Sequence, residues 1–430
     1  MNYTYKQIWL INFPVMMSIL MEQLINITDA IFLGHVGEVE LGASALAGIY
    51  YLAVYMLGFG FSIGLQVMIA RRNGEQHYKE TGRTFFQGVY FLSRMAVILC
   101  LLLHLASPLI LRRLITSDEI YQAVIHYLDW HSFGLLFSFP FLAFRSFLVG
   151  ITTTKALSVA AIMAICINIP FNYLLIFKLN LGISGAAMAS SLAEFGAFIV
   201  LLLYMWVRVD KVKYGLKVVY DGKVLIKLLR ISVWSMLHFF VSVAPWFLFF
   251  VAIEHLGRTE LAISNITRSV STVFFVIVNS FASTTGSLVS NLIGAGQGKE
   301  LFPVCHKVLR LGYAVGGPLI VMALWGNQWV IGFYTNNDNL VRLAFYPFIV
   351  MLLNYAFALP GYVYINAVTG TGKTKLAFIF QLITILVYLI YLYLLSECFH
   401  ASLTVYMTAE YLFVILLGIQ SIIYLKRKSN

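Results

Sequence analysis

Long apolar runs, separated by short polar connections, follow one another along almost the whole chain. Each run is close to or longer than the roughly 20 residues that a helix needs to cross the hydrocarbon core of a bilayer. The runs are continuous rather than alternating, which indicates helices and not the strands of a barrel. We therefore predict an all-α polytopic membrane protein with twelve transmembrane helices, over residues 7–33, 41–70, 84–108, 122–149, 156–177, 182–207, 225–253, 260–293, 303–327, 340–368, 375–396 and 402–425.

The chain also contains an internal duplication with an offset of 220 residues. The segment "GHVGEVEL" (34–41) matches "EHLGRTEL" (254–261) at a histidine, a glycine, a glutamate and a leucine. The segment "VGITTTK" (149–155) matches "TGTGKTK" (369–375), and a proline recurs at the same offset. Separate blocks that share one offset indicate a repeat. Each copy has six spans, an even number, so we expect two parallel lobes that enter the membrane from the same side.

This duplication predicts the domain organisation. We expect an N-terminal six-helix lobe at 1–207, a cytoplasmic inter-lobe linker at 208–230 and a C-terminal six-helix lobe at 231–430. The duplication also explains "TGTGKTKL" (369–376), in which G-K-T resembles the end of a phosphate-binding loop. Ala367 replaces the first glycine of that motif, and an apolar run rather than a short strand precedes it. We interpret the segment as the second copy of a polar turn and not as a nucleotide site.

Composition and charge support a membrane protein. The chain is 60% hydrophobic and only 11% charged, whereas a soluble domain has about 25% charged residues. The net charge of +11 comes from basic residues in alternate connections, which by the positive-inside rule places both termini in the cytoplasm. The basic excess therefore indicates topology rather than nucleic-acid binding. We expect a monomeric, multi-pass protein of the inner (plasma) membrane, surrounded by the lipid bilayer.

The cysteines and histidines point to no catalytic or metal chemistry. The four cysteines and nine histidines show no metal-binding spacing and no redox motif. A Ser/His/Asp set for catalysis cannot be argued either. We therefore expect a protein that is not an enzyme and that has no cofactor, so the polar residues inside the apolar runs become the candidates for function.

Several of those polar residues lie in motifs that resemble the MATE (multidrug and toxin extrusion) family of the MOP superfamily. The segment "NITDAIFLGHVGEVELGASALAG" (26–48) is similar to the family's first-span signature, and "INIPFNYLLIFKLNLGISGAAMASSLAE" (167–194) to its fifth-to-sixth-span signature. The segments "LVGITTTK" and "VTGTGKTK" resemble weaker versions of another family motif, and "LVSNLIGAGQGKE" (288–300) resembles the end of the eighth span. The motifs keep the family's order and spacing over nearly the whole chain.

The resemblance implies a secondary antiporter. Such proteins export small-molecule organic cations and drugs in exchange for H⁺ or Na⁺, by alternating access of two lobes. The alternative is a lipid-linked oligosaccharide flippase of the same superfamily. That activity would need cationic groups in the central cavity, and the family resemblance would then imply about fourteen spans. Twelve spans and an aspartate inside a span favour the antiporter.

The resemblance also implies a cation-coupling site in the first lobe. Asp29 stands where the family has its coupling aspartate, and a carboxylate in a partly dry site can exchange a proton or, with more oxygen ligands, hold Na⁺. Asn168 and Asn172 lie one helical turn apart, and some branches of the family have an aspartate at the second of these positions. Ser190 matches the family's hydroxyl ligand. We expect these four side chains at the coupling site, with Na⁺ ligands at Asp29, Asn168 and Asn172.

Bland readings of the same residues stay open. Asp29 could only hydrogen-bond a neighbour near the outer end of its span, and the asparagines could only join helices. Glu22, Asn26 and Asp29 share one helix face by spacing, so Glu22 is either a second proton or substrate group or a solvated acid near the interface. Glu194, one turn after Ser190, is either functional or structural. No acid stands in the tenth span, so we expect the coupling chemistry in the first lobe.

Overall fold

The computed structural model describes residues 3–115, 117–254, 256, 258–332, 338–398 and 401–429. Nearly all of these residues are helical, and none of them forms a strand. Twelve helical segments are long and apolar enough to cross a membrane. The predictions of an all-α fold and of twelve spans are therefore confirmed. His255 and Gly257, which belong to the repeated block near 254–261, lie outside the described residues.

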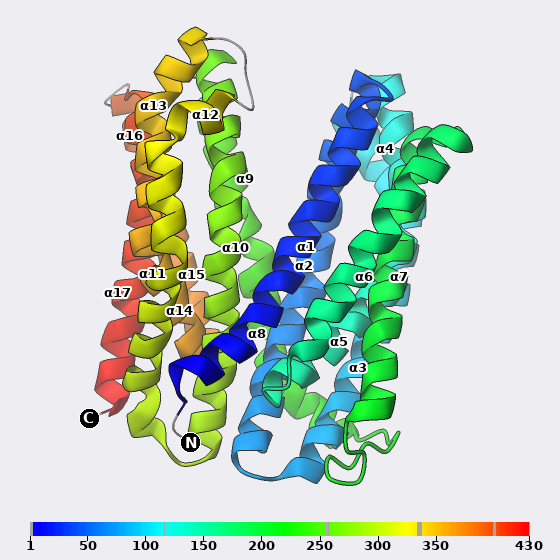
Figure 1. Ribbon diagram of the computed structural model, residues 1–430, viewed down its shortest axis with the longest axis vertical. Coiled ribbons are helices and arrows are strands. Elements are labelled where there is room, and N and C mark those ends of the chain that lie inside the picture. Colours follow the sequence, from blue (N-terminus) through cyan, green and yellow to red (C-terminus); the bar gives the residue numbers. More distant parts are fainter. Residues whose placement is uncertain are drawn as a thin grey trace. The chain divides into compact units, whose positions relative to one another are not determined.

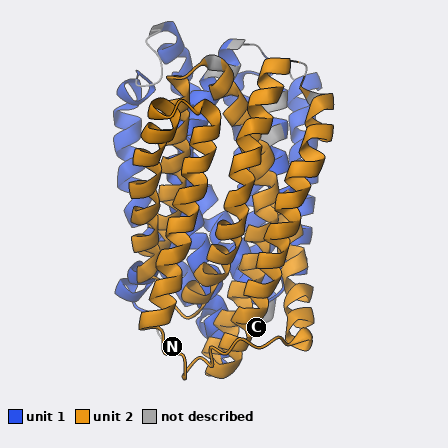
Figure 2. Cartoon of the chain, turned by 90° about the vertical axis from the view of Figure 1, so that its right-hand side faces the viewer, with its two compact units in different colours: residues 1–12, 241–430 blue, residues 13–240 orange. Residues whose placement is uncertain are grey.

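The chain forms two compact units, shown in Figure 2. One unit is residues 13–240, and the other joins residues 1–12 to residues 241–430. The first unit holds α1 (Tyr5–Gly34) from Phe13 onward, α2 (Glu38–Gly74), α3 (Tyr78–Leu114), α4 (Asp118–His131), η1 (Ser132–Gly134), α5 (Leu135–Gly150), α6 (Lys155–Asn172), the π-helix η2 (Tyr173–Lys178), α7 (Gly182–Arg208) and α8 (Gly222–Val241) up to Phe240 (Figure 1).

The second unit holds the remaining elements in the same order along the chain. They are α9 (Val243–Glu254), α10 (Arg258–Gly294), η3 (Gly298–Glu300), α11 (Leu301–Trp325), α12 (Asn327–Gly332), α13 (Asp338–Leu353), α14 (Tyr355–Gly370), α15 (Thr374–Tyr393), the π-helix η4 (Leu394–Cys398), α16 (Leu403–Tyr406) and α17 (Thr408–Ser429).

The duplication is visible in the backbone as well as in the sequence. Gln76 and Gly296 both have positive φ, 62° and 72°, and Thr152 and Gly372 have φ of 59° and 84°. Each pair is separated by the same 220 residues as the repeated motifs. Left-handed backbone is uncommon outside glycine, so its recurrence at matching positions shows that both copies keep the same turns. The G-K-T segment is thus the turn between α14 and α15, as the sequence predicted.

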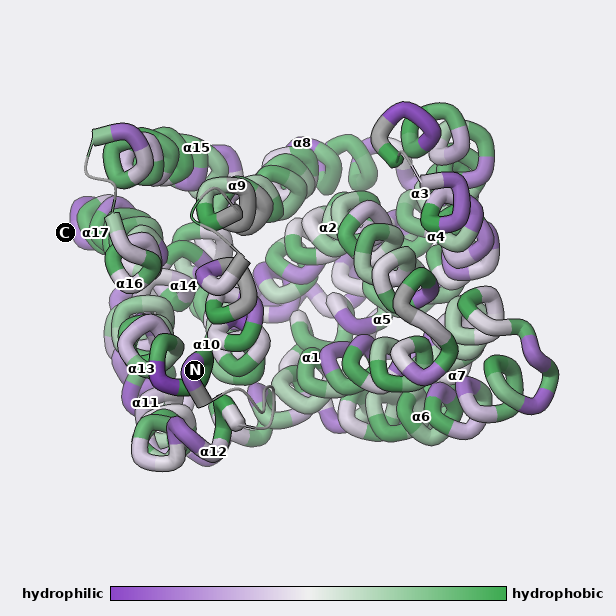
Figure 3. Tube along the Cα trace, turned by 90° about the horizontal axis from the view of Figure 1, so that it is seen from above, coloured by the Kyte–Doolittle hydropathy of each residue, from purple (hydrophilic) through white to green (hydrophobic). Residues whose placement is uncertain are grey.

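The outward faces of the helices are apolar, as a lipid environment requires. Figure 3 shows hydrophobic colouring along most of the helical segments, with hydrophilic residues gathered largely near their ends. On α3, Leu105 and Leu109 are 71% and 74% exposed. Large leucines that face outward in a helix with no charged neighbours on that turn are expected against acyl chains rather than water.

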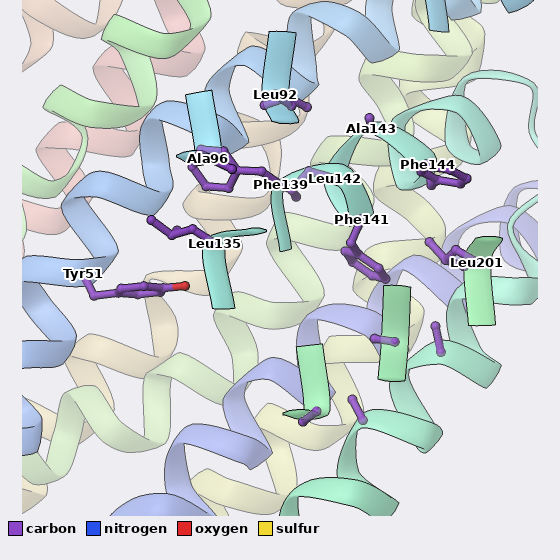
Figure 4. Packing of buried hydrophobic residues seen from close by; sticks show 14 of the residues in the cluster. Tyr51, Leu92, Ala96, Leu135, Phe139, Phe141, Leu142, Ala143, Phe144 and Leu201 are labelled. Atoms are coloured by element: carbon purple, nitrogen blue, oxygen red, sulfur yellow. The ribbon is translucent and has the colours of Figure 1, made fainter. Parts of the chain in front are cut away.

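The core of residues 13–240 is built around α5, which is buried along most of its length. Figure 4 shows Phe139, Leu142 and Phe144 of this helix among Leu92 of α3 and Leu201 of α7. Phe139 and Leu142 are 0% and 1% exposed. Such interdigitation of large and small side chains gives the dense packing typical of protein interiors and fixes the helices that carry the polar residues described below.

The connection after α7 is shorter than the sequence suggested. Residues 222–230, expected in the linker, form the first turns of α8. The Oδ1 atom of Asp221 accepts hydrogen bonds from two backbone N–H groups of that turn, which is how an aspartate starts a helix. Gln87 of α3 donates to the Val219 carbonyl at 2.7 Å and accepts from the Asp221 N–H at 3.0 Å. The connection is therefore fastened to α3.

Helices α2 and α8 approach so closely that glycine is required at their contact. A Cβ atom added at Gly60 would lie 2.6 Å from the Cα of Met236, and one at Gly64 would lie 2.7 Å from the Cα of Ser232. These neighbours are backbone atoms, which cannot rotate away as a side chain can. The two helices pack backbone against backbone at this point.

We predict that Gly60→Val destabilises the protein by about 1–3 kcal/mol, because overpacking a close helix contact forces backbone shifts. The measurement is thermal unfolding of the purified protein in detergent. Gly42→Val on the same helix is the matched control, since a Cβ there meets no atom within 4 Å. Equal melting temperatures for the two variants would contradict the close approach of α2 and α8.

Candidate functional site

A buried carboxylate near the end of α1 is the centre of the candidate site. Asp29 is 7% exposed and accepts side-chain hydrogen bonds from two helices. On α6, the Nδ2 atoms of Asn168 and Asn172 donate to its Oδ1 atom at 3.0 and 2.5 Å. On α7, the hydroxyl of Ser190 donates to its Oδ2 atom. The four residues predicted at the coupling site therefore lie together.

The partners of Asp29 also bind one another. The Nδ2 atom of Asn172 donates to the Oδ1 atom of Asn168 at 3.0 Å, and the Nδ2 atom of Asn168 donates to the Ser190 hydroxyl at 3.3 Å. Both asparagines are fully buried, and Ser190 is 4% exposed. A network in which each member is held by the next fixes the rotamers around the carboxylate.

Small residues bring α6 and α7 close enough for these contacts. A Cβ atom added at Gly185 would lie 2.8 Å from the carbonyl carbon of Leu175, so the start of α7 packs directly on the π-helix that follows α6. Asn180 and Gly182 turn the chain between them with φ of 53° and 52°. The G-x-x-G-A-A segment thus serves to place Ser190 opposite the asparagines of α6.

The chemistry of this cluster suits a proton or a hard cation. Three donors converge on Asp29, which stabilises its ionised form in a place that water reaches poorly. The Oδ1 atom of Asn172 is buried and has no hydrogen-bond partner within the described part of the chain. Carboxylate, amide and hydroxyl oxygens are ligands for hard cations. Groups of three or more His, Cys, Asp or Glu side chains that could hold a transition metal do not occur among the described residues.

Two other predicted residues on α1 lie outside the cluster. Glu22 and Asn26 are exposed, whereas Asp29 on the same helix is buried. The donors of α6 and α7 reach α1 only at Asp29, and neither Glu22 nor Asn26 makes a hydrogen bond within the described ranges. The shared face predicted from their spacing therefore does not form one site.

Glu194 lies in a second polar group, one turn beyond Ser190 on α7. Its carboxylate packs against Gly134, where an added side chain would collide with it. The hydroxyl of Tyr51 faces this carboxylate, and the ring of Tyr51 lies 4.1 Å from that of His131. The sequence analysis missed Tyr51 and His131, because their spacing distinguishes them from the other aromatic and polar residues of the spans in no way.

Arg145, to which the sequence assigned no role, is buried behind Glu22. It is 2% exposed on α5, and its guanidinium lies 5.7 Å from the centre of the Phe59 ring. Its charge and that of Glu22 act on each other, without a direct ion pair between them in the part of the chain that the structure describes. This charge pairing makes Glu22 more than a solvated acid.

The second unit contains its own buried polar cluster. Arg268 of α10 lies 3.7 Å from the Oε1 atom of Glu410 on α17, and its guanidinium covers the ring of Phe249 at 4.7 Å. The hydroxyl of Tyr388 on α15 donates to Glu410 at 3.3 Å. Glu410 is the acid of this cluster, and it lies neither in the seventh nor in the tenth span.

Twelve apolar helices in two copies, with a carboxylate and amide cluster buried inside one of them, define an integral membrane protein with an intramembrane polar site. A sequence model of the MatE family matches this chain twice, at residues 14–174 and at residues 235–394. One match falls in each copy of the duplication, and together they cover well over half of the chain. The chain therefore belongs to the MatE family.

Individual relatives are distant but extensive. A probable multidrug resistance protein NorM of Idiomarina loihiensis is 21% identical over 351 residues, which cover 77% of this chain and 73% of that protein. The multidrug and toxin extrusion protein 1 of Mus musculus is 26% identical over 320 residues, 70% of this chain and 55% of that protein. Among solved structures, a MOP superfamily transporter from Pyrococcus furiosus has the same fold, with a TM-score of 0.90, 16% identity and coverage of 99% and 96% of the two chains.

We predict that Asn172→Asp makes stability dependent on pH and on Na⁺. Two carboxylates this close cannot both be charged without a cation between them. The variant should lose about 3–5 kcal/mol at neutral pH, which is typical of an uncompensated buried charge. Acidification or added Na⁺ should restore the stability by supplying the missing positive charge.

The measurement is the melting temperature at several pH values in Na⁺ and in an equal concentration of choline. Asn180→Asp, an exposed turn position, is the control and should show neither effect. A variant at position 172 that melts like the parent protein in choline at neutral pH would show that Asp29 and residue 172 do not share a site.

Proposed function

We propose that this protein is a secondary antiporter that exports organic cations or drugs in exchange for H⁺ or Na⁺. The observation that carries the proposal is the Asp29 cluster, in which an intramembrane carboxylate is held by Asn168, Asn172 and Ser190. A buried acid inside a membrane protein is costly unless it has a function. Membership of the MatE family supports an extrusion role, because the named relatives are multidrug resistance and extrusion proteins.

In the proposed cycle, Asp29 alternates between a loaded and an unloaded state. When the coupling cation binds from outside, it replaces part of the work of the three donors in balancing the carboxylate charge. Release to the cytoplasm returns the carboxylate to its donors. A proton is the simplest coupling ion, because all three contacts that reach Asp29 come from donors. Na⁺ is the alternative, since the oxygens of Asp29, Asn168, Asn172 and Ser190 could form its ligand set.

The competing proposal from the sequence, a lipid-linked oligosaccharide flippase, is not favoured. The family match and the named relatives concern multidrug and toxin extrusion. The proposed setting is a multi-pass monomer in the inner membrane with both termini in the cytoplasm, which the basic connections support through the positive-inside rule. Transport rather than catalysis is the proposed activity, with no cofactor other than the coupling ion.

We predict that Asp29→Asn abolishes the response of transport to the ion gradient while dye binding is kept. The assay is efflux of a fluorescent organic cation from proteoliposomes, with a proton gradient and a sodium gradient imposed separately. We expect the gradient-dependent rate to fall by about 5-fold to 150-fold, the usual range of a coupling free energy. The gradient that drives the parent protein identifies the ion.

Thr28→Val is the matched control, because Thr28 precedes Asp29 and its hydroxyl bonds only to the Leu24 carbonyl of its own helix. This variant should respond to the gradient like the parent. Gradient-driven efflux that survives in Asp29→Asn would remove Asp29 from the coupling site and turn attention to Glu22 and Glu194. A parent protein that moves no cation under either gradient would count against export of organic cations.

A further inference from the structure

The two copies can be compared position by position, because one offset holds along the whole repeat. Helices α2 and α10 begin 220 residues apart, at residues 38 and 258, and both end at a glycine, Gly74 and Gly294. The two π-helices, Tyr173–Lys178 and Leu394–Cys398, fall at the same separation. A π-helix is rare, so its recurrence fixes the register of the helices on either side of it.

At this offset, the second copy places its own polar cluster where the first copy has the Asp29 cluster. The four members of the first cluster correspond to Phe249, Tyr388, Leu392 and Glu410, in the order Asp29, Asn168, Asn172 and Ser190. Three of the four equivalents, Phe249, Tyr388 and Glu410, are the contacts of Arg268 or its acid. Both sites thus consist of one buried acid with a side-chain donor from the neighbouring helix.

The copies differ in where the positive charge comes from. In the second copy, Arg268 brings a guanidinium to Glu410 at 3.7 Å and covers the ring of Phe249 at 4.7 Å. Phe249 stands at the position of Asp29, so the arginine lies over the place that the acid takes in the first copy. The position equivalent to Arg268 in the first copy is Gly48, where an added Cβ would meet no atom within 4 Å.

We propose that Arg268 is a tethered cation that permanently fills the second copy's version of the cation site. The first copy has a glycine and open space where the second has this side chain, so its acid is left to take an external cation. The inference rests on the proposed antiport function for its meaning, but not for its test. It assigns a guanidinium-sized cation site to Glu410, Tyr388 and Phe249.

The proposal explains why the two copies have diverged in charge. A carboxylate held by a fixed guanidinium cannot release its cation, so the second copy cannot alternate between loaded and unloaded states. Only the site around Asp29 would exchange its cation during transport. The buried pair would then serve to keep the second copy in one state, because separating two charges in a membrane interior is costly.

The first test replaces the tethered cation by a free one. We expect Arg268→Gly, which copies Gly48, to lower the melting temperature in detergent, and millimolar guanidinium chloride to recover most of that loss, while the same concentration of sodium chloride does not. Arg94→Gly is the control, because Arg94 is an exposed arginine in a span and should give no recovery. A melting temperature of Arg268→Gly that guanidinium leaves unchanged would overturn the proposal.

The second test places a tethered cation in the first copy. We expect Gly48→Arg to fold like the parent and to lose the response of dye efflux to the ion gradient, as if its site were permanently filled. Gly48→Gln, similar in length but uncharged, should keep that response. A Gly48→Arg protein that still follows the gradient would contradict the equivalence of the two positions.

The two tests separate the present inference from the proposed antiport. Recovery by guanidinium is a binding measurement and stands even if no cation is transported. If Arg268→Gly does not fold, the double variant Arg268→Gly with Glu410→Gln removes both charges of the pair. It should fold and gain no stability from guanidinium, since the acid that binds the cation is gone. Recovery in the double variant would show that guanidinium acts elsewhere and would overturn the proposal.

Discussion

A single carboxylate, which must keep its charge balanced in a place that water barely reaches, determines much of the architecture of residues 13–240. An unpartnered ion in such surroundings costs several kcal/mol, so Asp29 needs donors from other helices. Asn168 and Ser190 supply them, and both lie on helices that Gly185 allows to pack closely. The tight α6–α7 hairpin, its left-handed turn and the buried amides are therefore consequences of one ionisable group.

Most of the fold and the centre of the site could be predicted from the sequence, because both leave local signals. A membrane span must be apolar over its whole length, so the twelve runs were visible at once. A polar residue inside such a run stands out, which is why Asp29, Asn168, Asn172 and Ser190 could be identified before their contacts were known. The duplication was equally clear, since Pro140 and Pro360 repeat at the same offset as the motifs.

The remaining features depend on contacts between distant helices, which spacing along one helix cannot show. Glu22 and Asp29 share a face by periodicity, yet only Asp29 meets donors. Arg268 and Glu410 are paired across more than a hundred residues of sequence, and nothing near either residue indicates the other. The start of α8 was also missed, because its lysines suggested a linker. They lie on the exposed side of an amphipathic first turn that Asp221 caps.

The division of the chain into two units has a mechanical consequence. The chain passes between the units after Asn12 and after Phe240, and both crossings lie in helical segments. Pro14 follows the first and cannot donate a hydrogen bond to the preceding turn; Ser242, where α8 gives way to α9, follows the second. The connection at 209–221 is fastened to α3 and is no crossing. The two halves are thus joined by a pair of bendable rods rather than by a slack cord, so stiffening one joint would brake the whole molecule.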